Sequence, residues 1–129
     1  MIRALAGLSL GVAIALLTAN PAAAVCNEQS SADRADCLRG ALADADGQLF
    51  EALQKLLKSI DKRPIPASGR DEWKGAAVKS HYLWLGYRDA QCDVVMYEWW
   101  GGNGALNAVT ECLVLLTREQ ADRIARSAD

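Results

Sequence analysis

The side chains of this 129-residue sequence that could do chemistry are four cysteines and a single histidine. They are Cys26, Cys37, Cys92, Cys112 and His81. Thiolate and imidazole groups bind zinc, and a cysteine paired with a histidine can act as a nucleophile. The cysteines have no Cys-x-x-Cys spacing, and one histidine supplies only one imidazole. The sequence therefore favours no metal site and no cofactor.

The even number of cysteines is typical of a disulfide-linked exported protein. Three pairings are formally possible. We favour Cys26 with Cys37 and Cys92 with Cys112, because these pairs close short loops of 12 and 21 residues. Each closure contributes about 3 kcal/mol in the chain-entropy treatment of disulfides. We therefore expect two local bridges.

Known enzyme motifs do not occur in the sequence. It has no GxSxG, HExxH or GxxxxGK[ST], and no strand pattern precedes the glycine-rich residues 101–104. Glu98 beside two tryptophans suggests a glycan site, but a glycosidase needs a second carboxylate and none is evident. We therefore expect no catalytic residues, with a small glycan-active enzyme as the less favoured alternative.

A second group of residues is suited to binding a protein partner. It consists of Tyr97, Glu98, Trp99, Trp100 and Asn103. The glycines at 101–104 predict a loop here, and the expected Cys92–Cys112 bridge would tether its base. A preorganised loop loses little entropy on binding, and tryptophan is a favoured interface anchor. The alternative is that both tryptophans pack in the core.

Arg88 needs an anionic or carbonyl partner because it lies among aromatic residues. Asp46 is a candidate, which would make the two a structural pair between helices. The alternative is that Arg88 contacts a partner protein. His81 is expected beside the apolar face of the same helix, either as a structural residue or as a partner contact.

The first 24 residues resemble a secretory signal peptide. Arg3 precedes an apolar run over residues 4–19, and the segment ends in small residues at 22–24. We expect cleavage after Ala24, which leaves residues 25–129 as one periplasmic or secreted domain without stable membrane insertion. An uncleaved anchor or lipidation of Cys26 is less favoured, the latter because bulky Val25 precedes the cysteine.

The remaining chain is slightly acidic, with 13 basic and 16 acidic residues after removal of residues 1–24. No basic surplus remains for binding nucleic acid or an anionic membrane. Basic proteins are more suitable partners.

Apolar residues recur at helical spacing in three stretches. The first, from Ser30 to the prolines at 64 and 66, has Leu38, Leu42, Ala45, Leu49, Leu53, Leu56 and Ile60 on one face. The second, residues 71–96, has Trp73, Ala77, Ser80, Trp84, Tyr87, Gln91 and Val94. The third starts at Ala105 with Leu106, Val109, Leu113 and Leu116, and residues 117–127 either continue it or form a separate helix. The pattern predicts an all-α bundle of three to four helices with a long first helix.

Several of these segments together resemble the LprI-type lysozyme-inhibitor domain family. They are Cys26 and Cys37, residues 45–49, the WLGYRDAQC stretch at 84–92, Gly-Gly-Asn at 101–103, Cys112 and Thr117-Arg118. The resemblance runs from Cys26 to about Ile124, although Gly86 and Asn103 depart from the usual family residues. It implies a helical, disulfide-linked exported domain that binds and blocks a lysozyme or other muramidase. The alternative is an envelope interaction module that binds another cell-wall enzyme or effector.

Overall fold

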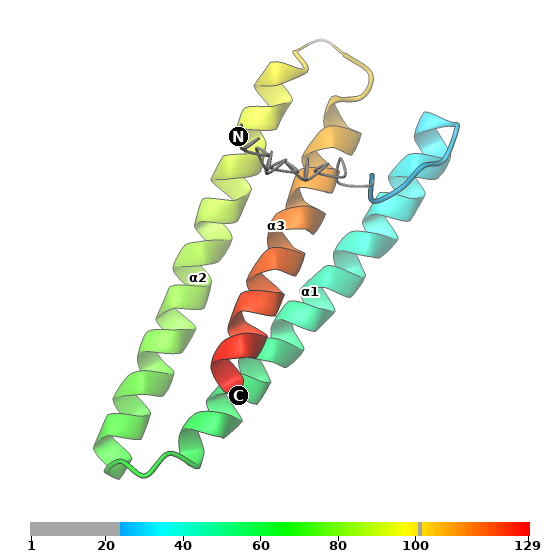
Figure 1. Ribbon diagram of the computed structural model, residues 1–129. Coiled ribbons are helices and arrows are strands. Elements are labelled where there is room, and N and C mark those ends of the chain that lie inside the picture. Colours follow the sequence, from blue (N-terminus) through cyan, green and yellow to red (C-terminus); the bar gives the residue numbers. More distant parts are fainter. Residues whose placement is uncertain (1–23, 101) are drawn as a thin grey trace, which may run out of the picture.

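The computed structural model describes residues 24–100 and 102–129, and within these ranges the protein consists of three helices without strands. They are α1 (Ser31–Asp61), α2 (Ala67–Glu98) and α3 (Ala105–Ala128). α1 and α3 run in the same direction and α2 runs in the opposite one, with α3 between the other two (Figure 1). α3 packs extensively on α1 and less on α2, whereas α1 and α2 make few contacts. The all-α prediction is confirmed.

The sequence determines both ends of α1. Ser30 caps its start, because its Oγ accepts a hydrogen bond from the backbone nitrogen of Asp33 at 3.0 Å. Pro64 and Pro66 lie beyond Asp61 and cannot continue the helical hydrogen bonding. The predicted apolar face is confirmed: its residues are buried except Leu42, which is half-buried.

The largest cluster of buried side chains lies between α1 and α3. Leu49, Ala52, Leu56 and Ile60 of α1 meet Ala121, Ile124 and Ala128 of α3, with Ala77 and Trp84 of α2 packed against them. Each fully buried aliphatic side chain of this size stabilises the fold by about 1.5 to 3 kcal/mol. The cluster joins the parallel helices firmly and includes α2 only at its edge.

α2 is rotated relative to the prediction and is longer, beginning four residues earlier and ending two later. Cys92 is its only buried residue, and five residues of the predicted face are exposed: Trp73, Ser80, Tyr87, Gln91 and Val94. The prediction of this face was wrong because apolar residues occur on two sides of α2. The contacts of Cys92 and Arg88 with α3 decide which side faces inward.

α3 is one continuous helix through residues 117–120, so the separate fourth helix does not form. Its buried face also differs from the prediction. Leu106 is 70% exposed, whereas Ala105, Val114 and Thr117 are buried. Thr117 is buried because a polar partner on α2 satisfies its hydroxyl group.

The predicted leader lies almost entirely outside the described residues, which begin at Ala24. Within the described part of the chain, none of the helices is both long enough and apolar enough to cross a membrane.

Candidate partner-binding end of the bundle

The start of α1 lies at the end of the bundle where α2 turns into α3, which we call the loop end (Figure 1). Both disulfides lie toward this end, because Cys37 is in the second turn of α1 and Cys92 and Cys112 are near the α2–α3 loop. Cys26 is bonded to Cys37 and Cys92 to Cys112, with Cα atoms 6.1 and 5.7 Å apart. This is the pairing that loop length favoured. The first bridge holds the segment before α1 against that helix, and the second holds α2 against α3 two turns before the loop. The loop between α2 and α3 therefore has a covalently fixed base.

The cysteine sulfurs are not available as metal ligands. Glu28 lies within 4.8 Å of the sulfurs of Cys26 and Cys37, an arrangement that could hold a cation if the thiols were free. Because the two sulfurs are bonded to each other, neither can become the thiolate that zinc requires.

Three aromatic side chains project at the loop end, and we call them the aromatic tip: Tyr97, Trp99 and Trp100. Trp99 is 50% exposed and Trp100 is 79% exposed. The rings of Tyr97 and Trp100 stack with their centroids 5.8 Å apart and their planes 9° apart. The tryptophans are therefore not part of the core, and the stack orders one of them at the surface.

Trp99 is positioned by two glycines of the loop. Its carbonyl oxygen accepts a hydrogen bond from the backbone nitrogen of Gly102 at 2.8 Å. Its ring covers Gly104 so closely that an added Cβ there would lie 3.0 Å from Cζ3 of the ring. A side chain at position 104 would therefore displace the indole.

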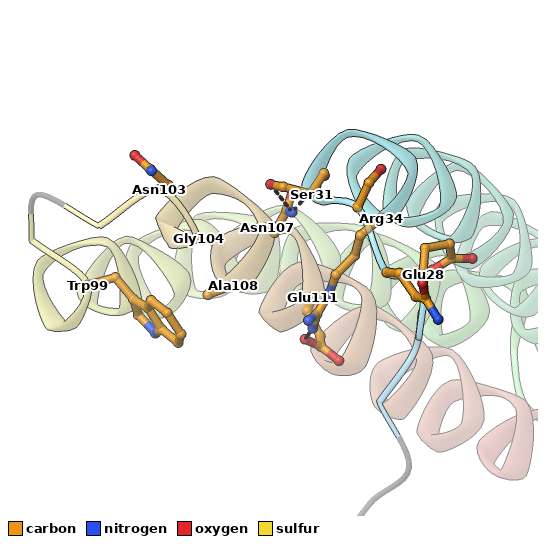
Figure 2. A pocket seen from close by; sticks show the side chains of 11 residues that line it. Glu28, Ser31, Arg34, Trp99, Asn103, Gly104, Asn107, Ala108 and Glu111 are labelled. Carbon is orange, nitrogen blue, oxygen red and sulfur yellow. Dashed lines mark hydrogen bonds and ion pairs between the residues drawn. The ribbon is translucent and has the colours of Figure 1, made fainter.

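A pocket of about 350 Å³ lies beside Trp99 (Figure 2). Its walls come from the segment before α1, the start of α1, the loop and the first two turns of α3; the residues are Glu28, Gln29, Ser30, Ser31, Arg34, Trp99, Asn103, Gly104, Asn107, Ala108 and Glu111. Trp99 and Asn103 thus share this pocket. Tyr97, Glu98 and Trp100 do not line it, and Glu98 is exposed near the end of α2. The structure thus brings Trp99 together with Asn103 at the pocket and Tyr97 together with Trp100 in a stack.

The far wall of the pocket is an ion pair that sequence reasoning missed. Nη2 of Arg34 lies 2.6 Å from Oε2 of Glu111, and the backbone nitrogen of Val25 donates to Oε1 at 3.0 Å. One turn earlier on α3, Nδ2 of Asn107 donates to the carbonyl oxygen of Ser31 at 3.1 Å. These contacts join residues 76 to 86 positions apart, which no local pattern reveals. The only local signal was a carboxylate directly before Cys112.

Arg88 connects the three helices in the middle of the bundle. Its Nη1 lies 3.0 Å from Oδ1 of Asp46 on α1 and donates to Oγ1 of Thr117 on α3 at 3.1 Å. Its guanidinium carbon lies 5.7 Å from the centre of the Trp84 ring, and its side chain is only 13% exposed. A guanidinium with these contacts orients the helices, which agrees with the interpretation of Arg88 and Asp46 as a structural pair.

His81 lies seven residues, or about two turns, before Arg88 on α2 and is half-buried. Partial burial lowers the pKa of its imidazole, and the positive charge of Arg88 lowers this pKa further. Its Nδ1 is buried without a hydrogen-bond partner among the described residues. The side chain is half-buried against the bundle, which favours a structural role.

Charge is unevenly distributed along the bundle. At the loop end, residues 24–46 and 88–116 contain nine carboxylates and three lysines or arginines. At the other end, residues 47–87 and 117–129 contain seven carboxylates and ten lysines or arginines. The aromatic tip therefore lies in a half with a net charge of -6, whereas the opposite half carries +3.

The described part of the chain is thus a helical, doubly disulfide-linked domain with an acidic end that exposes aromatic side chains. A family model described as "Lysozyme inhibitor LprI" matches residues 24–124. The chain therefore belongs to the LprI lysozyme inhibitor family. No curated protein and no solved structure matches it.

Proposed function

We propose that this protein is an exported lysozyme inhibitor that binds a muramidase through its loop end and blocks the substrate cleft. Export would follow from cleavage of the leader after Ala24. The observation that supports the binding role most strongly is the exposure of Trp99 and Trp100 on a covalently fixed loop. Large aromatic side chains in fixed positions bury much surface on binding at a small cost in entropy.

The charge distribution supports the same face. The loop end carries the acidic surplus of the molecule. Many lysozymes are basic proteins, so an acidic face would increase the rate of encounter and disfavour the opposite orientation. The basic half lies away from this face and would not oppose the approach.

The pocket beside Trp99 supplies polar groups around the aromatic anchor. The pair of Arg34 and Glu111 supplies a donor and an acceptor on its far wall. A polar rim around an aromatic anchor is the usual arrangement of a protein interface. The side chain of Asn103 points away from the indole of Trp99, toward the outside of the loop (Figure 2).

The test is the rate at which lysozyme clears a cell-wall suspension in the presence of the mature protein. We expect the wild type to slow lysis by lysozymes of at least one class. Trp100→Ala and Trp99→Ala should each raise the half-inhibitory concentration by about 10-fold or more, as for anchor residues at other interfaces. Phe50→Ala is the matched control, because Phe50 is 62% exposed on α1 outside the loop end.

Three results would contradict the proposal. Unchanged lysis at large molar excess, for lysozymes of several classes, would exclude inhibition. A specific partner other than a muramidase, captured from periplasmic extract, would instead favour an envelope interaction module. Release of reducing ends from peptidoglycan that Glu98→Gln abolishes would indicate an enzyme.

A further inference from the structure

α2 has a second apolar face, which points away from the bundle. Leu83, Tyr87, Ala90 and Val94 follow one another in steps of four, three and four residues, and we call them the outer seam. Leu83 is 67% exposed, Tyr87 57% and Val94 51%, and Ala90 is exposed as well. Steps of this kind place side chains in one line along a helix and are the spacing of paired helices.

The bundle itself leaves the outer seam uncovered. α3 lies against only one side of α2, and α1 is separated from most of α2 by α3 (Figure 1). α2 buries one residue, whereas α1 buries seven and α3 six. Scattered exposed apolar residues are ordinary, but an aligned set on one helix indicates an interaction surface.

We propose that the outer seam binds a second copy of this chain, with the two α2 helices antiparallel. In such a pair, each seam residue of one helix lies opposite a seam residue of the other helix. With the twofold axis between Tyr87 and Ala90, Tyr87 faces Ala90 of the second copy and Leu83 faces its Val94. Each large side chain then meets a smaller one, and every contact occurs twice. A parallel arrangement would instead place Tyr87 against Tyr87 and Ala90 against Ala90.

The charge distribution also selects the antiparallel arrangement. The twofold axis lies at the level of Arg88, where the acidic half of the chain meets the basic half. In an antiparallel pair, the half with charge -6 lies alongside the half with charge +3 of the other copy. A parallel pair would bring the two acidic halves together. Electrostatic complementarity of this kind mainly fixes the orientation of a complex.

The size of the seam predicts a weak dimer. The outer seam spans 12 residues of one helix, or about 18 Å, so four side chains of each copy cover less than the roughly 800 Å² per partner of a standard interface. The pair should therefore dissociate in the micromolar range. Its two loop ends point in opposite directions, one at each end of the pair. The inference is independent of the proposed function.

The first experiment measures the mass of residues 25–129 by sedimentation equilibrium between about 1 and 200 µM. We expect a shift from monomer to dimer over this range. Tyr87→Glu and Leu83→Glu should keep the chain monomeric throughout, because both place a charge in the seam. Tyr82→Glu is the matched control, since Tyr82 is a 68% exposed residue of α2 outside the seam, and it should dimerise like the wild type. Helical circular dichroism of each variant establishes that it is folded.

The second experiment tests the orientation with a short thiol-specific crosslinker. The described part of the chain has no free cysteine, so only introduced thiols react. Leu83→Cys mixed with Val94→Cys should crosslink as a heterodimer, and Leu83→Cys alone should crosslink poorly.

Three outcomes would overturn the proposal. They are a monomeric wild type at 200 µM, a dimer that Tyr87→Glu does not weaken, and preferred crosslinking of Leu83→Cys to itself. Loss of lysozyme inhibition by Tyr87→Glu, with a monomeric wild type, would assign the seam to a muramidase and not to a second copy.

Discussion

The backbone nitrogen of Val25 lies 3.0 Å from Oε1 of Glu111, so the start of the expected mature chain is held to the second turn of α3. The other carboxylate oxygen binds Arg34 at 2.6 Å. If the leader is removed after Ala24, the nitrogen of Val25 becomes an ammonium group directly on this carboxylate. The contact would then be a charged pair that forms on maturation.

Glu111→Gln should therefore destabilise the mature chain. The substitution keeps the shape of the side chain but removes the charge that faces Arg34 and the amino terminus. We expect a loss of about 1.5 to 3 kcal/mol, the range for hydrogen bonds to charged groups, measured by urea unfolding of residues 25–129. Glu119→Gln is the control, because its pair with Arg123 is 64% exposed on both sides and should change stability little. Equal effects of the two substitutions would refute this role of Glu111.

Arg88 should tolerate replacement poorly even by lysine. Arg88→Lys keeps one positive charge but loses the planar guanidinium, whose Nη1 contacts Asp46 and the buried hydroxyl group of Thr117 while its Nε donates to Asp89. We expect a loss of about 1 to 3 kcal/mol in the free energy of unfolding. Arg118→Lys, at an exposed position of α3, should leave the urea midpoint nearly unchanged. An unaltered midpoint for Arg88→Lys would show that the guanidinium does not orient the helices.

His81 should make stability depend on pH. Its pKa in the folded protein is lowered by burial and by Arg88, so the unfolded chain takes up a proton first as the pH falls. Stability should therefore decrease as the pH falls from about 7 through the ordinary histidine pKa of about 6.5. His81→Gln removes this titration, and its urea midpoint should change less between pH 8 and pH 5 than that of the wild type. The same change in both proteins would contradict the prediction.

The sequence was sufficient for features that depend on local spacing. The face of α1 could be predicted because large aliphatic residues such as Leu49, Leu56 and Ile60 occur on one side only. The disulfide pairing followed from loop length, and the cap at Ser30 from a side chain three residues before its partner. In each case the interacting residues are near in sequence or recur at the spacing of one helix face.

The rotation of α2 could not be predicted from periodicity. Trp84 and Cys92 lie on one side of this helix, and Leu83, Tyr87 and Val94 lie on another. Periodicity alone does not determine which of these two apolar faces of α2 packs inward, because that choice depends on the contacts with α3. The pocket wall formed by Arg34 and Glu111 was likewise hidden, because its members are 77 residues apart and neither belongs to a motif.

Hydrogen exchange of the mature chain, with and without a lysozyme that it inhibits, locates the binding face in one measurement. We expect exchange to slow at the end of α2, the loop and the first turn of α3, which together span residues 97–108, and to remain unchanged at the turn between α1 and α2. Protection confined to that turn, or no protection at residues 97–108 in a complex known to form, would contradict binding through the aromatic tip.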